Sequence, residues 1–555
     1  MRSGRAASRG PPCPANDRDR GLRPPGLRPA RPDQAPLPRR MAPANFRNRL
    51  RAEAGQAGAR SERDTGDPEV QMSVVVNNRD DFTLENYRRV AMGGESVSIG
   101  PEARQAMTEG RANFLRLLES DRSQYIYGGT SSVGPRAKFT IPPDQQRAHG
   151  RAFGFRGNWG RGFGGGYLDE RVVRGIVFAR LANFVAGNSK ARPALAKRLA
   201  ALLDGPLPWV PLDGEVGAGE VLPMAHVLQG FRRDDLEEGE ANPLVNGSPV
   251  SAALAADTVL QARHRLDHAE QIFALSVEAF GAPLDSYDDV LDDLWGDNDE
   301  ASALAALRRY LESASPDGRT SAAVPASYRV LGRVLGQAHR AVTGAEETAR
   351  VSLRSVTDNP VYVSPDDGHP LGRAFSTGGF HNAMAYPALN ALAAAWADLT
   401  LLAQRHVTAL CTTAVSPPPG QASGPAAGVA TGLEPVLGGL VEEARAAAMP
   451  TLLPAAVNDA QDDVSSPTFS AYRRHARAAE CLDGALAVLA AEASQALFSS
   501  GRQPARPLHN LLVTVRATFP PVEESPRDLG ARAGDLAAAL ARSAVTGSAP
   551  FGTSR

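Results

Sequence analysis

Apolar residues follow a helical spacing through most of the chain after residue 170. In the segment 382–411 apolar side chains recur three or four residues apart, which is the spacing of one face of an α-helix. Pro387 fits this segment only if it lies in the first turn. Similar patterns predict helices over 170–187, 248–281, 299–313, 322–345, 382–411, 468–499 and 527–545. The longest are rich in alanine and span roughly 45 Å at 1.5 Å per residue, so we expect an all-α bundle with closely packed helices.

The chain before residue 170 has shorter elements. Ser73–Val76 is a strand candidate, and the segment 81–91 is predicted to be a helix with Thr83 as its N-cap and Asn86 at the third helical position. The segment from Tyr127 to Gly166 is glycine-rich and weakly periodic. We therefore expect a long loop there, and loops of that length in compact proteins are usually functional.

The first 71 residues differ from the rest in composition. They hold 15 Arg, no Lys and 8 acidic residues, a net charge of +7, with no helical or strand period. Such a segment cannot bury enough apolar surface to order itself, so we expect a disordered basic tail. It is either an RNA-binding or transit-like extension, or the product of a mis-assigned start, with Met72 as the true beginning. We expect a loop-rich domain over 72–250 and the helical bundle over 251–545.

The body of the chain carries a net charge of −8, which argues against nucleic acid or an anionic membrane as its main partner. The cysteines of the whole chain (Cys13, Cys411 and Cys481) are widely spaced. They form neither a disulfide framework nor a metal-binding pattern, and they fit a reducing cytoplasm. His, Cys and acidic residues do not cluster at metal-ligand spacing, so no metal site is expected. No apolar run appears long enough to span a bilayer.

The stretch Gly214–His226 reads GEVGAGEVLPMAH, and further motifs surround it in a fixed order. It resembles the loop G-S-V-G-A-S-G-D-L-A-P-L-A-H of the histidine/phenylalanine ammonia-lyase family with one residue missing. Other stretches resemble that family's Y-G-V-N-T-G-F-G, L-x-N-G-T, D-N-P and S-G-G-N-F-H motifs; they are Tyr127–Gly134, Leu244–Ser248, Asp358–Pro360 and Ser376–His381. The resemblance covers about residues 73–545.

The resemblance implies an almost all-α fold with a small α/β-like N-terminal part, and a homotetramer whose sites are each built from three subunits. In that family Ala-Ser-Gly cyclises and dehydrates to an electrophile, 4-methylideneimidazole-5-one (MIO), whose methylidene carbon is the Ser Cβ. Here Ala218 is followed directly by Gly219. We therefore expect that this degenerate loop forms no MIO and that the chain carries no cofactor.

Several residues match positions that act on the substrate in the family. Tyr127 falls on the general-base tyrosine, although a phenol titrates near pH 10 and needs help to accept a proton. Arg329 falls on the arginine that grips the substrate carboxylate, a task that suits a bidentate guanidinium. Asn246 falls on an asparagine that binds the substrate or the MIO group. Each has a structural alternative: Tyr127 could be a packed aromatic ring, Arg329 a solvated or helix-capping residue, and Asn246 part of a turn-forming Asn-Gly pair.

Gln461 lies in a stretch that resembles the phenylalanine-type N-Q-D-V-N-S, and as a neutral amide it can bind but not act as a base. Other positions depart from the family. Ala326 stands where the second catalytic tyrosine would be, Gly379 replaces an asparagine, and Arg156 places a cation at the substrate-side dipeptide. His381 and His226 are expected to be structural.

These departures surround the electrophile and fit a re-purposed site. The sequence predicts an MIO-independent lyase-like enzyme that performs elimination, conjugate addition, dehydration or cyclisation on a small, possibly aromatic carboxylate. One alternative is a catalytically silent homologue that binds a ligand or an active paralogue. Another is a working ammonia-lyase that tolerates the missing serine.

The missing serine gives a direct test by mass spectrometry. The peptide that contains Ala218 and Gly219 should have its unmodified mass, because no serine lies between them to cyclise and dehydrate. Detection of that peptide with the loss of water that MIO formation causes would overturn this interpretation.

Overall fold

The computed structural model describes residues 73–152, 166–213, 217–231, 235–319, 324–415, 427–454, 463–521 and 528–546. Val70–Arg555 form one compact unit. Met1–Glu69 form a separate unit that lies outside the described ranges, so the tail predicted over 1–71 stays a prediction. The boundary that we expect between 250 and 251 falls inside the compact unit and is likewise untested.

The predicted strand opens a small parallel sheet. β1 (Ser73–Val76) pairs with β2 (Ser96–Ile99), and Ser73 lies opposite Ser96. Val74 and Val76 on β1 are buried while Val75 between them is exposed, as the two-residue period of a strand requires. The strand prediction is confirmed.

The predicted N-cap is also present. α2 (Leu84–Ala91) begins after Thr83, whose Oγ1 accepts a hydrogen bond from the Asn86 backbone N–H at 3.1 Å. This bond satisfies one of the N–H groups that the first turn of a helix leaves without a partner.

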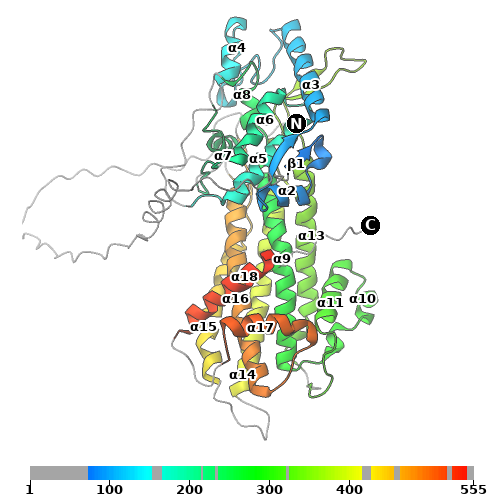
Figure 1. Cartoon of the computed structure of the whole chain (residues 1–555), viewed down its shortest axis with the longest axis vertical. Coiled ribbons are helices and arrows are strands. Elements are labelled where there is room, and N and C mark those ends of the chain that lie inside the picture. The colour runs from blue at the N-terminus through cyan, green and yellow to red at the C-terminus, as the bar shows by residue number, and fades with distance from the viewer. Residues whose placement is uncertain are drawn as a thin grey trace, which may run out of the picture. The chain divides into compact units, whose positions relative to one another are not determined.

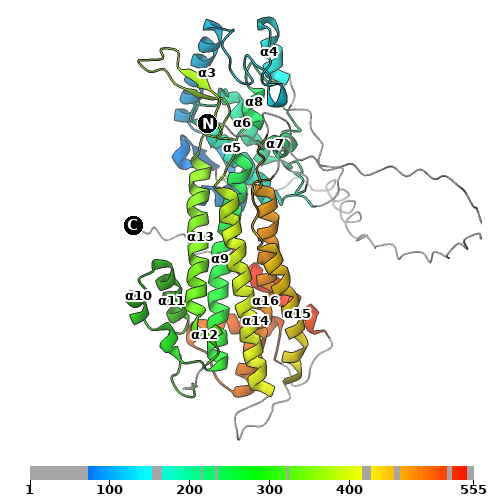
Figure 2. The same ribbon diagram turned by 180° about the vertical axis from the view of Figure 1, so that it is seen from behind.

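Long helices run side by side in the bundle, as both views show (Figures 1 and 2). They are α9 (Pro249–Phe280), α13 (Leu331–Arg354), α14 (Ala385–Val415), α15 (Ala427–Ala447) and α16 (Thr468–Ser500). α5 (Glu170–Val185) packs on α9 and α2. The predicted all-helical bundle is confirmed, and Pro387 lies in the first turn of α14, where its missing N–H costs nothing.

Shorter elements surround the long helices (Figure 1). The shorter α-helices are α3 (Pro101–Ser120), α4 (Pro143–Ala152), α6 (Pro193–Ala200), α7 (Val221–Val227), α8 (Ala241–Val245), α10 (Val290–Trp295), α11 (Asn298–Tyr310), α12 (Ala326–Arg329), α17 (His509–Thr518) and α18 (Leu529–Thr546). An antiparallel pair joins β3 (Val361–Val363) to β4 (Arg373–Phe375). Single 3-10 turns are η1 (Arg79–Asp81), η2 (Gly134–Arg136), η4 (Ala201–Asp204), η6 (Leu284–Tyr287) and η7 (Arg506–Leu508).

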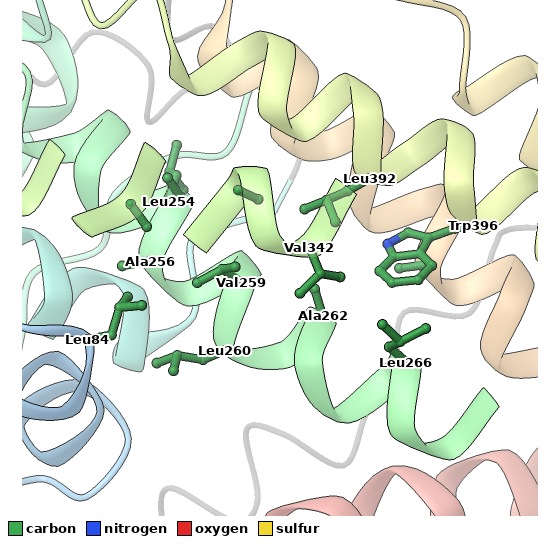
Figure 3. Close-up of a cluster of buried hydrophobic side chains, with 14 of the residues drawn as sticks. Leu84, Leu254, Ala256, Val259, Leu260, Ala262, Leu266, Val342, Leu392 and Trp396 are labelled. Carbon is green, nitrogen blue, oxygen red and sulfur yellow. The ribbon is translucent and has the colours of Figure 1, made fainter. Parts of the chain in front are cut away.

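The bundle core is built on α9. Figure 3 shows buried side chains of α9 together with those of its neighbours; the labelled residues include Leu254, Val259, Ala262 and Leu266 of α9, Val342 of α13, and Leu392 and Trp396 of α14. Trp396 is fully buried, and its Nε1 donates a hydrogen bond to Nε2 of His475 at 3.0 Å. Burial lowers the pKa of His475 to about 3, so the ring stays neutral and can accept this bond.

Two boundaries differ from the prediction. The helix expected over 322–345 is a single turn, α12, followed by α13, which runs from Leu331 to Arg354. Pro325 explains why α12 starts only at Ala326, because proline disfavours helical geometry in the residue before it. The expected loop over 127–166 contains α4, which starts at Pro143. α4 is strongly polar, so it lacks the apolar period by which helices were identified.

α16 corrects the expectation that no apolar run is long enough to span a bilayer. It contains an 18-residue window with a mean hydropathy of 1.3, enough by length and composition to cross a membrane. Within the structure 78% of that window is buried against the bundle. The burial identifies α16 as a core helix of this unit.

A distant carboxylate caps the first turn of α9. The helix has no N-cap side-chain bond from Ser248. Glu220 supplies the acceptors instead: one carboxylate oxygen accepts from the Ser251 N–H at 2.8 Å and the other from the Val250 N–H. An anion at this position also meets the positive end of the helix dipole. Burial raises the pKa of Glu220 to about 7, although these hydrogen bonds and the charge of Arg180 lower it.

The raised pKa predicts a pH dependence of stability. Because the folded protein binds the Glu220 proton more tightly than the unfolded chain, Glu220 contributes stability that is complete below pH 4.5 and is lost as the pH rises through about 7. The contribution is on the order of 3 kcal/mol at 1.36 kcal/mol per pKa unit. Between pH 4.5 and 7.5, the free energy of unfolding, measured with urea, should therefore fall less steeply with pH in Glu220→Gln than in the unmodified protein. Glu442→Gln, at a side chain that is 74% exposed, is the matched control and should leave the decline unchanged. An unchanged slope in Glu220→Gln would contradict the assignment.

Candidate functional site

The degenerate loop lies over the start of α9. The Gly217 carbonyl accepts a hydrogen bond from the Ser466 N–H at 2.9 Å, and Glu220 holds the other end of the loop on α9. A Cβ added to Gly219 would lie 3.7 Å from Cβ of Phe380, an ordinary contact. The loop therefore has room for a β-carbon at Gly219, but it is one residue shorter than the family's loop and carries no serine hydroxyl.

Asn246 ends α8, shortly before the first turn of α9 that Glu220 caps. Its side chain is buried, and Oδ1 has no hydrogen-bond partner among the described residues. Its backbone carbonyl accepts a hydrogen bond from Arg180, which also pairs with Asp358. Gly247 fits against this ion pair only because it has no side chain. A Cβ added to Gly247 would lie 2.8 Å from Nη1 of Arg180, which is too close. The buried pair thus fixes the backbone that presents Asn246.

The segment around Gly379 closes another side of the same region. Ser248 Oγ donates to the Gly379 carbonyl at 3.2 Å, and His381 Nε2 lies 3.2 Å from the Ser465 carbonyl. A Cβ on Gly379 would lie 3.1 Å from Cα of Thr357, so a larger side chain requires the backbone to shift. His381 therefore joins two loops, as expected of a structural histidine. His226 is buried in α7 with Nδ1 3.1 Å from Nε2 of Gln229, which also fits a structural role.

Tyr127 lies at the same end of the bundle. The next residue, Gly128, packs on α8, where an added Cβ would lie 3.2 Å from Cγ of Asn242. The Tyr127 side chain is 8% exposed and packs on Val133 and Ala137 within its own loop. Its hydroxyl oxygen accepts a hydrogen bond from the Gly134 N–H at 3.0 Å. The loop therefore holds the ring in one orientation.

Arg329 lies at the opposite end of the bundle. It closes α12, which contacts α14 near the last residues of α9 (Figure 2). The loop and Asn246 lie at the first residues of α9, and 32 helical residues span about 48 Å. Arg329 is exposed and has no recorded hydrogen bond or ion pair to the described residues. Ala326 opens the same turn. One chain thus places the loop of Tyr127 against α8, which Asn246 ends, but keeps Arg329 at the other end of the bundle.

Two predicted site residues, Arg156 and Gln461, lie outside the described residues. Their roles stay predictions. Across the described ranges no group of three or more His, Cys, Asp or Glu side chains could hold a metal ion.

The sequence analysis missed two buried charged residues of this region. Glu220 is one, and its capping partners lie about 30 residues further along the chain, beyond any local pattern. Lys190 is the other. It has a φ of 66°, its Nζ lies 5.3 Å from the centre of the Phe114 ring, and burial lowers its pKa to about 8, against the attraction of Asp358. A lysine in the left-handed region is unusual, and no sequence signal marks it.

Comparisons with known proteins agree with this fold and motif order. The sequence model of the aromatic amino acid lyases matches residues 82–232 and 228–517. The chain is 27% identical over 451 residues to histidine ammonia-lyase of Geobacillus thermodenitrificans (73% of this chain, 84% of that protein). It is 28% identical over 517 residues to tyrosine ammonia-lyase of Cereibacter sphaeroides (82% and 95%).

Solved structures show the same fold at lower identity. The ergothioneine-degrading enzyme ergothionase from Treponema denticola superimposes with a TM-score of 0.72 at 16% identity, over 86% of this chain and all of that one. Tyrosine aminomutase from Streptomyces globisporus gives 0.71 at 21% identity, over 87% of this chain and all of that one. With its motifs in order on this scaffold and the family model matched along most of its length, the chain belongs to the aromatic amino acid lyase family.

Proposed function

We propose that this chain is an MIO-independent enzyme of the aromatic amino acid lyase family that acts on a small carboxylate. The observation that carries the proposal is the state of the loop at Ala218 and Gly219. Its described part is held at Gly217 by Ser466 and at Glu220 by the start of α9, yet the loop contains no hydroxyl from which an electrophile can form. The scaffold of the site is kept while its reactive group is missing.

The chemistry of the loop excludes a methylidene group on either central residue. A methylidene carbon forms when the middle residue of a cyclised tripeptide loses its β-hydroxyl as water. Gly219 has no Cβ, and the Cβ of Ala218 carries no leaving group. A ring closed on this backbone therefore has no exocyclic double bond for an amine or an aromatic ring to attack.

The groups that remain can bind a carboxylate and move a proton. Arg329 offers a planar fork with no competing partner in the described chain. The Asn246 Oδ1 is a buried acceptor that a donor on the substrate would satisfy. Tyr127, whose hydroxyl accepts a bond from the Gly134 N–H, is the group that we propose transfers the proton. Positioning and acid–base catalysis by such groups suffice for elimination of a leaving group better than ammonia, or for addition, dehydration or cyclisation of an activated substrate.

The site requires more than one chain. Because α9 separates Arg329 from Asn246 by about 48 Å, we propose that Arg329 completes the site of a second copy. A homotetramer with shared sites, as the family resemblance implies, provides that arrangement. Its free, buried cysteines Cys411 and Cys481 accord with the proposed location in a reducing cytoplasm.

Two alternatives make different predictions. A silent homologue would bind carboxylates without turning them over. A working ammonia-lyase would release ammonia from phenylalanine, tyrosine or histidine, and it would need an electrophile from a source other than Ala218 and Gly219. Ligand binding, turnover of the bound carboxylate and ammonia release, measured on the same preparation, distinguish all three.

Conservative substitutions separate binding from proton transfer. Tyr127→Phe should abolish turnover and leave ligand affinity within a few fold, because only the hydroxyl is lost. Arg329→Lys should weaken binding by about 1.5–3 kcal/mol, because the charge stays but the planar fork is lost. Carboxylic acids found by thermal-shift screening serve as ligands for calorimetry and as candidate substrates.

Matched controls lie close by in the chain. Tyr125→Phe changes a half-exposed neighbour whose hydroxyl bonds the Ala137 carbonyl, and Arg333→Lys changes an exposed arginine paired with Glu300. Both should behave like the unmodified protein. If Tyr127→Phe and Arg329→Lys do so as well, the site lies elsewhere.

A further inference from the structure

A cavity of about 630 Å³ opens at the Arg329 end of the bundle. Its walls come from the end of α9, from α12 and the residues beside it, and from the second half of α14, and they include Phe280, Ala326, Val330 and Leu402. The volume lies in the range of pockets that hold small organic ligands. Val330 is 40% exposed, so this apolar surface is open in the single chain.

Ala326 makes room for the cavity. It contributes a single methyl group to the wall, one helical turn before Val330. The family resemblance places a tyrosine at this position. Replacing a phenol with a methyl group removes volume from the wall and leaves an apolar surface beside Arg329.

The rim of the cavity carries positive charge without a partner. Most arginines of the described chain bond a neighbour, as Arg319 bonds Glu278 and Arg333 bonds Glu300. Arg405 lines the cavity from α14, and its exposed side chain forms no hydrogen bond or ion pair with the described residues. Arg329 is not in the wall itself, but it ends α12 directly before Val330, which is, and its exposed side chain likewise forms no such bond with the described residues. An exposed guanidinium in the wall of an apolar cavity, with a second on the turn that builds the wall, favours a ligand that is both anionic and apolar.

The inner wall is rigid and offers one hydrogen-bonding group. Ser327 Oγ is buried, lines the cavity and has no partner in the described part of the chain. Behind it Tyr328 stacks on His406 with ring centres 3.8 Å apart, and Nδ1 of His406 lies 3.0 Å from Oγ of Ser276. Burial lowers the pKa of His406 to about 4, so this ring is neutral at neutral pH and the charge at the cavity comes from arginine.

We propose that this cavity is the specificity pocket of the enzyme, taking the apolar body of a carboxylate larger than a single aromatic ring, with Arg405 as a second anion-binding residue. The proposal rests on the proposed function, in which Arg329 holds the substrate carboxylate. Ser327 would bond a polar group on the ligand, since a buried hydroxyl without a partner is costly. The pocket thereby selects for size, a property that Arg329 alone does not supply.

The test compares ligands that differ only in size or charge. Calorimetry on the full chain would measure the dissociation constants of cinnamate, 4-phenylcinnamate and the neutral amide of 4-phenylcinnamate. The second ring should improve affinity about tenfold by burying apolar surface, and loss of the acid should weaken binding about tenfold. Ala326→Phe should remove the preference for the larger acid, and Arg405→Gln should weaken both acids. Val513→Phe, which adds the same bulk at a side chain that is 68% exposed on α17, is the control and should change nothing.

Several results would overturn the proposal. Three of them are binding results: equal affinity for both acids, a preference for the larger acid that survives in Ala326→Phe, and acid binding that is unchanged in Arg405→Gln. The fourth is a change of oligomeric state in either variant, measured by light scattering, which would mean that a second copy fills the cavity. Arg405 is exposed, so its replacement keeps the test open if Ala326→Phe does not fold. Binding is measured without turnover. A size preference without catalysis would therefore support the specificity pocket and contradict the proposed enzyme. Catalysis without a size preference would support the proposed enzyme and contradict the specificity pocket.

Discussion

The length of α9 is the constraint on which the rest of this structure depends. Its first turn is capped by Glu220, which fixes the degenerate loop, and it follows directly on Asn246 and Gly247. Its last residue, Phe280, lies about 48 Å away in the wall of the cavity beside α12. A straight, buried helix cannot shorten this separation. Every account of function must therefore treat the two ends as parts of different sites, or of one site completed by another copy.

The two ends have diverged from the family in complementary ways. At the loop end the reactive hydroxyl is missing, while the supports remain: the Arg180–Asp358 pair, the Glu220 cap and the Ser466 contact. At the other end Arg329 remains, and Ala326 leaves an open apolar cavity. The buried ion pair and the cap are each costly to leave half satisfied, so both hold the backbone around Asn246 and the loop in place.

The sequence predicts the long helices well because their apolar spacing is regular. The helix expected over 248–281 is α9 to within one residue at each end, and Thr83 caps α2 as predicted. α4 was missed because it is too polar to show a period, and the start of α13 was placed too early across Pro325. Motif order located Tyr127, Asn246 and Arg329. It carries no information on which of them meet in one chain, since that depends on helix length and direction.

Charged residues inside the fold were the hardest to predict. The partners of Glu220 are backbone N–H groups of a helix that starts about 30 residues later, and Lys190 adopts a backbone conformation that its residue type disfavours. The cavity was likewise invisible, because it arises where three separated segments meet.

The most direct test of the central claim is a photo-cross-link from the far end of the bundle. p-Benzoylphenylalanine would replace Arg329, and ¹⁵N-labelled and unlabelled chains would be mixed so that mass spectrometry separates links between chains from links within one. The account predicts links between chains, from position 329 to peptides around Tyr127 or Asn246. Links confined to single chains, or no link to either peptide, would contradict it.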